Sequence, residues 1–238
     1  MLLNKANVFK VPIKQQNLRN ICITSNKSKS FRQWYRDLWI PNTCKPPYWH
    51  FNQLGDPILR AKASEVPKDT IKEPEFAEFI DHMIKMLRKY NCVGIAAPQI
   101  GISLRIIVME FKENLKEKFT KEVYEAREMS TLPLTVMINP TLKVVNYDKR
   151  KFLESCESVK GYSAEVERYH SVYLTGVDEK NNEQILTLKG WNARIAQHEM
   201  DHLDGKLYID FMDRSTFHCT CWEVVNKKAG RVEIPFYK

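Results

Sequence analysis

The sequence predicts an α+β fold in which antiparallel or mixed β-sheets pack around one central helix. Two observations support this prediction. Segments rich in β-branched or alternating apolar residues follow one another through the middle of the chain, and a helix with an apolar face comes late, over residues 191–203. Strands that do not alternate regularly with helices favour an α+β fold over a doubly wound parallel sheet.

The first 36 residues differ from the rest of the chain in charge. They contain eight basic residues and no acidic one, whereas 29 basic residues balance 29 acidic ones over 37–238. A basic, acid-free leader with scattered apolar residues is typical of a mitochondrial transit peptide, with cleavage expected between residues 20 and 40. A disordered basic tail is the alternative. The neutral remainder gives no reason to expect nucleic-acid binding.

Two classes of protein are excluded by composition. No segment approaches the roughly 18 consecutive apolar residues of a membrane span. The six cysteines form no C-x-x-C pair, which argues against a disulfide scaffold and favours a reducing compartment.

After the leader, residues 37–52 are rich in aromatic residues and proline, and we expect an extended arm there. A core domain is predicted over 53–215. Its first long element is a helix over 73–90, with Pro74 in the first turn and apolar residues at helical spacing. The small residues of 92–101 predict a loop-like segment.

Strands are predicted next, at 104–111 and 136–145, where β-branched residues are frequent. Pro140 predicts an edge position or a bend in the second of them, because proline cannot donate to a sheet ladder. The charged segment 112–130 between them is helix-prone and predicts a surface excursion.

Two further strands are predicted at 171–178 and 184–188, joined by a polar hairpin turn. The helix over 191–203 follows, and its apolar face predicts that it is buried. A C-terminal extension is expected over 216–238, with a short helix or strand over 217–226.

The late helix carries His198 and His202 four residues apart, so both imidazoles lie on one face and could bind one cation. Glu199 lies about 100° round the helix from the first histidine, where it could act as a general base on a metal-bound water. The H-E-x-x-H motif alone is short enough to occur by chance, and a solvated helix face with two histidines fits it equally well.

A catalytic metal normally takes three protein ligands, so a third is needed. Cys156, Glu154, Glu157 or a remote carboxylate could supply it. Cys156 is the best candidate because a thiolate is a strong ligand, although a buried structural cysteine is the commoner role of a lone cysteine.

Three separated segments resemble, in order, the motifs of peptide deformylases. They are Val93-Gly94-Ile95-Ala96-Ala97-Pro98-Gln99, Glu154-Ser155-Cys156-Glu157-Ser158 and His198-Glu199-Met200-Asp201-His202-Leu203-Asp204-Gly205. Residues 55–60 also resemble the N-terminal signature of that family, so the similarity runs from about 50 to about 215. The insert at 112–130, Glu157 and the leader resemble the mitochondrial branch found in animals.

The resemblance implies a role for each matching residue. Cys156, His198 and His202 would hold the metal. Glu199 would act as general base and acid, while Gln99 and the backbone N–H of Glu157 would stabilise the oxyanion. The substrate would contact Val93, Gly94, Trp191 and Ile195. Glu154 and Arg168 would form an ion pair behind the ligands, the alternative being an ordinary surface pair.

The function implied is a metal-dependent hydrolase that removes the N-formyl group from the initiator methionine of new mitochondrial proteins and releases formate. The cofactor would be one divalent ion, Fe²⁺ first, or Zn²⁺ or Co²⁺. The expected partners are formylated nascent chains and the mitochondrial ribosome, in the matrix.

Two alternatives stay open. A deformylase-fold protein could bind nascent N-termini with weak or no catalysis, because Ser155, Glu157 and Trp191 depart from the family pattern. A metallopeptidase is the other alternative, and a cysteine ligand argues against it, since such sites normally add a carboxylate or a third histidine.

Overall fold

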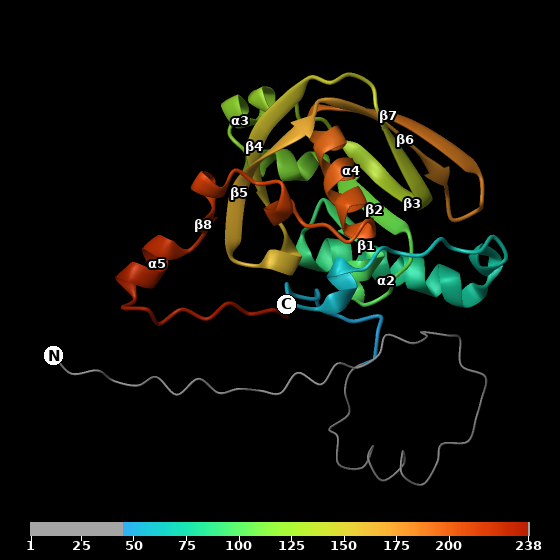
Figure 1. Cartoon of the computed structure of the whole chain (residues 1–238), viewed down its shortest axis with the longest axis horizontal. Coiled ribbons are helices and arrows are strands. Elements are labelled where there is room, and N and C mark those ends of the chain that lie inside the picture. Colours follow the sequence, from blue (N-terminus) through green and yellow to red (C-terminus); the bar gives the residue numbers. More distant parts are fainter. Residues whose placement is uncertain (1–44, 238) are drawn as a thin grey trace, which may run out of the picture. The chain divides into compact units, whose positions relative to one another are not determined.

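The computed structural model describes residues 45–237, in which eight strands form two antiparallel sheets (Figure 1). The predicted leader, its cleavage region and residues 37–44 of the predicted arm lie outside the described residues. The larger sheet has the order β1-β2-β3-β6-β7: Gly94–Ala96, Ile106–Phe111, Leu132–Val144, Ser171–Val177 and Glu183–Lys189. The smaller sheet has the order β4-β5-β8: Lys149–Ser155, Tyr162–Tyr169 and His218–Cys219.

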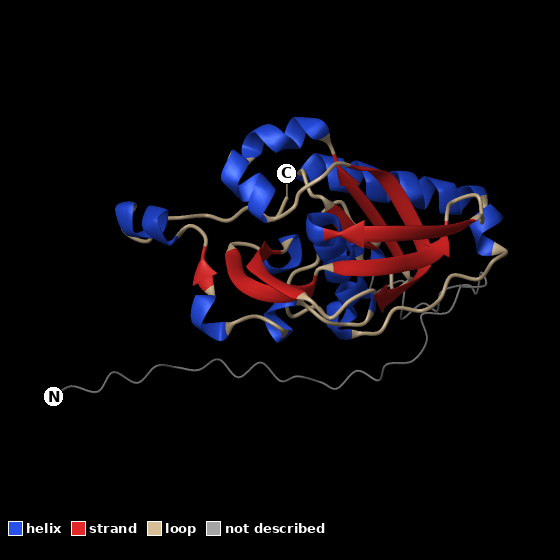
Figure 2. Cartoon of the chain, turned by 90° about the horizontal axis from the view of Figure 1, so that it is seen from above, coloured by secondary structure: helices blue, strands red, loops and turns tan. Residues whose placement is uncertain are grey.

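The helices are α2 (Pro74–Tyr90), α3 (Lys121–Ala126), α4 (Gly190–Leu203) and α5 (Trp222–Lys227). Helix α4 contacts strands of both sheets, and α2 lies against the larger sheet (Figures 1 and 2). The predicted α+β fold with sheets around the histidine helix is therefore confirmed. Within residues 45–237, none of the helices is both long and apolar enough to cross a bilayer.

Helix α2 confirms the prediction made from its apolar spacing. Its apolar stripe, including Ile80, Met83 and Leu87, is buried against the core that β1, β2 and β3 share. The helix ends at Tyr90, because Asn91 adopts a left-handed conformation with a φ of 56°. That turn directs the chain into β1, which lines the functional site described below.

The segment 92–101 is not a loop, and this prediction was wrong. Gly94–Ala96 form β1 at the edge of the larger sheet, and Ala97–Ile100 form a buried 3₁₀ turn. Small side chains let this backbone pack closely in the interior, so their low β-propensity is overridden by burial.

Strand β3 confirms the bend predicted at Pro140 but not the edge position. It lies between β2 and β6, and its register shifts between Ile138 and Thr141. Asn139 has a φ of 50°, and its side-chain amide hydrogen-bonds both backbone groups of Val66, at 2.8 and 2.9 Å. This β-bulge accommodates proline inside a central strand.

Strands β4 and β5 were not predicted. The first three residues of β4, Lys149, Arg150 and Lys151, are all exposed, so the strand begins without the apolar alternation that reveals a half-buried strand. The hairpin between β6 and β7 is confirmed, with Asp178 accepting backbone hydrogen bonds from Lys180 and Asn182.

The insert at 112–130 is only partly a surface excursion. It forms a 3₁₀ turn over Glu113–Lys118 and helix α3, yet Met129 is buried and Phe119 packs against the core of the larger sheet. A short helix or strand was predicted over 217–226, and the structure has one of each near there, the strand β8 and the helix α5.

Gly190 joins β7 to α4 and so sets where the histidine helix begins. Its φ is +53°, and a Cβ there would lie 2.7 Å from both the Cβ and the carbonyl oxygen of Glu128. Only glycine fits this position without moving the end of the insert.

Gly190→Ala should therefore destabilise the fold by about 2–4 kcal/mol, because it adds backbone strain and overpacking. Gly230→Ala is the matched control. Gly230 also has a positive φ, of +82°, but a Cβ there has no neighbour within 4 Å, so only the strain of about 1 kcal/mol should remain. Urea unfolding measures the loss of stability in each variant. Equal free energies of unfolding for the two variants would contradict the predicted overpacking at Gly190.

Candidate metal centre

The structure brings Cys156, His198 and His202 together. One possible ligand atom from each lies within 4.8 Å of the other two. The Sγ of Cys156 is 3.3 Å from Nε2 of His202, and the two imidazole centroids are 5.1 Å apart. Cys156 directly follows β4, and the histidines lie one turn apart on α4, so the packing of the smaller sheet against α4 creates the cluster.

The donor set fits a divalent first-row metal ion. A thiolate and two imidazoles are ligands that Zn²⁺ and Fe²⁺ accept, and three protein ligands leave a position for water or substrate. Cys156 and His202 are buried and His198 is nearly so. A buried cluster of this kind differs from the exposed acidic groups that gather on protein surfaces without binding a metal.

Glu154 holds His198 in place. Its carboxylate accepts a hydrogen bond from Nδ1 of His198 at 3.1 Å, which leaves Nε2 of that ring as the available ligand atom. The same carboxylate accepts two hydrogen bonds from Arg168, at 2.9 and 3.0 Å, and one from Arg194 at 2.6 Å. Although burial would raise the pKa of Glu154, His198 and Arg168 hold that pKa well below its ordinary value.

The Glu154–Arg168 pair is therefore not an ordinary surface pair, because their side chains are only 5% and 7% exposed. Sequence reasoning missed two other members of this network. Arg194 lies four residues before His198 on α4 and so shares its face, a spacing that could have revealed it. Asp201 accepts a hydrogen bond from Nη1 of Arg168 at 2.6 Å.

The carboxylate of Glu199 lies inside the protein without a full set of partners. The residue is 4% exposed, and its Oε2 has no hydrogen-bond partner among residues 45–237. Burial raises the pKa of Glu199 to about 7. Gly94 on β1 faces it so closely that a Cβ there would collide with Oε1. A buried carboxylate with an unused oxygen is typical of a group that contacts a ligand or substrate.

The side-chain amide of Gln99 has a fixed orientation. Its Oε1 accepts a hydrogen bond from the backbone N–H of Ala96 at 2.9 Å, so its Nε2 must be the donor end. That Nε2 donates to Oγ of Ser158 at 3.2 Å and faces Sγ of Cys156 at 3.5 Å. Gln99 therefore presents its donor toward the cluster. Glu157 follows Cys156 and begins the turn Glu157–Val159.

A cavity of about 730 Å³ opens beside the cluster. The residues predicted to contact substrate all line it: Val93, Gly94, Trp191 and Ile195. Glu199, Gln99, Glu157, Cys156 and His198 line it as well. This volume falls within the range of small-molecule and peptide sites.

The insert supplies part of this wall, which sequence reasoning missed. Phe119 and Arg127 line the cavity, and both contact Trp191. The Phe119 and Trp191 rings meet edge to face with centroids 6.4 Å apart, and the Arg127 guanidinium lies 5.2 Å from the indole centroid. The three side chains therefore form one contiguous part of the cavity wall.

Comparison with known proteins gives consistent results. A sequence model described as polypeptide deformylase matches residues 49–218. The chain is 38% identical over 182 residues to human mitochondrial peptide deformylase, covering 76% of this chain and 75% of that protein. It is 46% identical over 163 residues to the Arabidopsis thaliana chloroplastic/mitochondrial peptide deformylase 1A, covering 68% of this chain and 61% of that protein.

The solved structures that resemble this protein include peptide deformylases. One is a class I type b peptide deformylase from Acinetobacter baumannii with Met-Ala-Ser bound. Its TM-score is 0.60 at 27% identity, over 68% of this chain and 97% of that one. Another is a peptide deformylase from Synechococcus elongatus in complex with actinonin. Its TM-score is 0.59 at 31% identity, over 81% of this chain and 91% of that one.

Glu154→Gln should destabilise the protein strongly, by about 3–5 kcal/mol, because it leaves the buried guanidinium of Arg194 without a charge partner and that of Arg168 with Asp201 alone. Asp81→Asn is the control, since it breaks the exposed i,i+4 pair between Asp81 and Lys85 and should cost at most about 0.5 kcal/mol. Denaturant unfolding compares the two, and a small effect of Glu154→Gln would show that the network is not a structural requirement.

Proposed function

The chain belongs to the peptide deformylase family, metal-dependent enzymes that remove the N-formyl group from nascent proteins, and we propose that its Cys156, His198 and His202 cluster carries this reaction. The observation that supports the proposal most is that the side chains needed for this reaction lie around one cavity. Two of the three clustered ligand side chains, Cys156 and His198, border one cavity together with the buried carboxylate of Glu199 and the oriented amide donor of Gln99.

We propose Fe²⁺ as the native ion, with Zn²⁺ or Co²⁺ as ions that the same ligands accept. A cation held there would act as a Lewis acid and lower the pKa of water at the open position. The hydrogen bond from His198 to Glu154 fixes the tautomer that this coordination needs.

Glu199 is proposed to transfer a proton from the attacking water to the leaving amine. Its Oε2 has no hydrogen-bond partner among the described residues, so it can accept the proton of the attacking water. As the C–N bond of the formamide breaks, Glu199 passes that proton to the leaving amine. The products are formate and a free amino terminus, so one water is consumed for each formyl group.

Gln99 and the backbone N–H of Glu157 are proposed to stabilise the negative charge that develops on the formyl oxygen. The hydrogen bond from Ala96 to Oε1 of Gln99 keeps the amide donor aimed at the cluster before substrate arrives. Preorganised donors of this kind contribute about 3 kcal/mol each to transition-state stabilisation.

The methionine side chain is proposed to occupy the end of the cavity near Val93, Trp191 and Ile195. Gly94 lets the substrate backbone approach Glu199, because any side chain there would displace that carboxylate. Since Phe119 and Arg127 pack against Trp191, the insert would limit how long a first side chain can be.

We propose that the enzyme acts in the mitochondrial matrix on formylated chains as they leave the mitochondrial ribosome. The acid-free basic leader over residues 1–36 supports import, and human and plant relatives carry mitochondrial names. The deformylase match over residues 49–218 favours this function over the metallopeptidase alternative.

The direct test is formate release. The full chain reconstituted with Fe²⁺ should bind one metal ion and release formate from formyl-Met-Ala-Ser, and Glu199→Gln should lower kcat by at least about 100-fold while the metal content stays at one. An enzymatic formate assay and elemental analysis give both numbers. Metal-replete protein that binds the peptide tightly but releases no formate would instead identify a binding protein.

Trp191→Leu should widen the methionine pocket. The ratio of kcat/KM for formyl-Phe to formyl-Met peptides should rise at least about 5-fold, because shape discrimination in apolar pockets is worth about 1–3 kcal/mol. Trp222→Leu is the control, since Trp222 on α5 is 53% exposed and lies outside the cavity lining. If the ratio of kcat/KM values does not change in Trp191→Leu, Trp191 does not line the methionine pocket.

A further inference from the structure

The C-terminal extension returns to the cavity after leaving the deformylase match, which ends at residue 218. Strand β8 pairs with the start of β5, where Ser163 and His218 share a 3.1 Å hydrogen bond. Helix α5 follows, and Gly230, with its φ of +82°, precedes a final extended segment. We call residues 231–237 the C-terminal strap.

The strap lines the same cavity as the metal cluster. Its residues Val232, Glu233, Ile234 and Pro235 border that cavity together with Glu199 and Gly94. A site built only from the family core would lack this wall, because residues 219–238 lie beyond the match.

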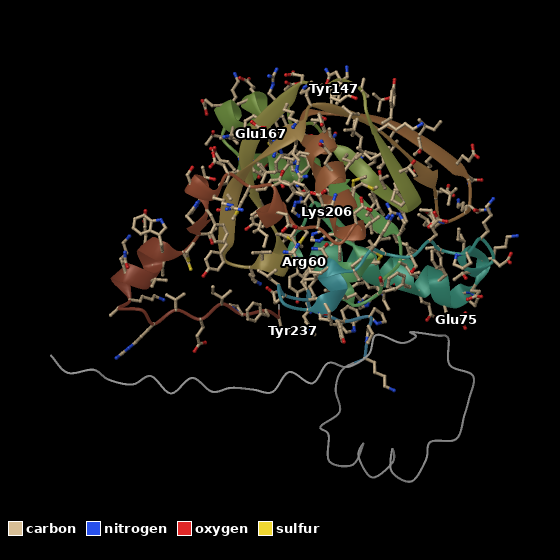
Figure 3. The ribbon with its side chains drawn as sticks, viewed as in Figure 1. Arg60, Glu75, Tyr147, Glu167, Lys206 and Tyr237 are labelled. Atoms are coloured by element: carbon tan, nitrogen blue, oxygen red, sulfur yellow. The ribbon has the colours of Figure 1, made fainter. Side chains whose placement is uncertain are left out.

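Contacts with two segments of the protein hold the strap. Ile234 packs so closely on Gly161 that a Cβ there would lie 2.8 Å from the Ile234 Cδ1. At the end of α2, the hydroxyl of Tyr90 lies 3.3 Å from the carbonyl oxygen of Phe236, and Lys89 Nζ lies 3.8 Å from the centroid of Tyr237. Figure 3 labels Tyr237 where the strap reaches the body of the protein.

The strap presents an apolar side to the protein. Val232 and Ile234 are half-buried, whereas Arg231, Glu233 and Pro235 are exposed, the alternation of an extended chain with one covered side. Among the described residues, no hydrogen bond reaches the backbone groups of 233–235. The N–H and C=O groups of Glu233 and Ile234 therefore stay unpaired, and because consecutive residues of an extended chain point these groups to opposite sides, one of the two residues can face a peptide in the cavity.

The strap is a wall of the cavity and does not fill it. About 730 Å³ remain open with the strap in place, enough for several residues of a peptide. The cavity continues from Glu199 to Ile234, so a chain whose first residue lies at the cluster can run outward along the strap.

We propose that the C-terminal strap binds the residues that follow formylmethionine. Val232 and Ile234 would give apolar contact to those side chains, and the N–H and C=O of whichever of Glu233 and Ile234 faces the cavity would hydrogen-bond the extended peptide. The strap then favours extended nascent chains over shorter formylated molecules. This inference rests on the proposed deformylase function.

The test compares two substrates, formyl-methionine amide and a formyl-Met-Ala-Leu-Ile-Ser peptide, in the full chain and in a chain that ends at Gly230. Removing residues 231–238 should raise KM for the long peptide about 5- to 10-fold and leave kcat/KM for the amide unchanged. The double variant Val232→Ser/Ile234→Ser should reproduce the effect without deletion. Arg231→Ser, at an exposed position outside the cavity lining, should change neither substrate.

Two outcomes would overturn the proposal. An equal change for both substrates would mean that the strap only supports the fold, and faster turnover of the long peptide after truncation would mean that the strap obstructs the cavity. Formate release from formyl-methionine amide reports the deformylase function separately. The ratio between the two substrates therefore tests the strap alone.

Discussion

The buried carboxylate of Glu154 is the interaction on which the site depends. It lies near the end of β4, and its partners come from β5 and α4: Arg168, Arg194 and His198. Two guanidinium groups and one imidazole converge on it in the interior. One side chain thereby fixes the distance between the segment that carries Cys156 and the helix that carries both histidines.

The network satisfies the physical conditions for burying charge. An isolated carboxylate or guanidinium is costly in a low-dielectric interior, and the cost falls only when charges pair and the remaining hydrogen bonds are made. Arg194 also donates to the carbonyl groups of Val166 and Arg150, and Arg168 also donates to Asp201. Because each arginine has several acceptors, the geometry around Glu154 is specified from more than one side, which suits a site whose ligands must be preorganised.

The sequence predicted the local parts of this arrangement and missed the long-range ones. The spacing of His198 and His202 revealed their shared face, and apolar periodicity revealed α2 and α4, since both signals lie within one element. Thiolate chemistry made Cys156 the best candidate for the third ligand, but only the family resemblance favoured it over a buried structural cysteine, because its proximity to α4 arises from the tertiary structure. Strand β4 was missed since its first residues are charged and exposed, and the buried segment around Gly94 was mistaken for a loop. Phe119, Arg127 and the C-terminal strap reach the cavity through segments outside the motifs, so no local pattern could place them.

We propose that the Glu154 network presents one thiolate and two imidazoles to one metal ion, and the proposed reaction depends on this coordination. X-ray absorption at the edge of the bound metal in the full chain tests this most directly. For the chain loaded with Zn²⁺, we predict a shell with one sulfur at about 2.3 Å and two imidazole nitrogens at about 2.0–2.1 Å. A shell of oxygen and nitrogen only, without sulfur, would contradict the assignment of Cys156 and with it the centre proposed here.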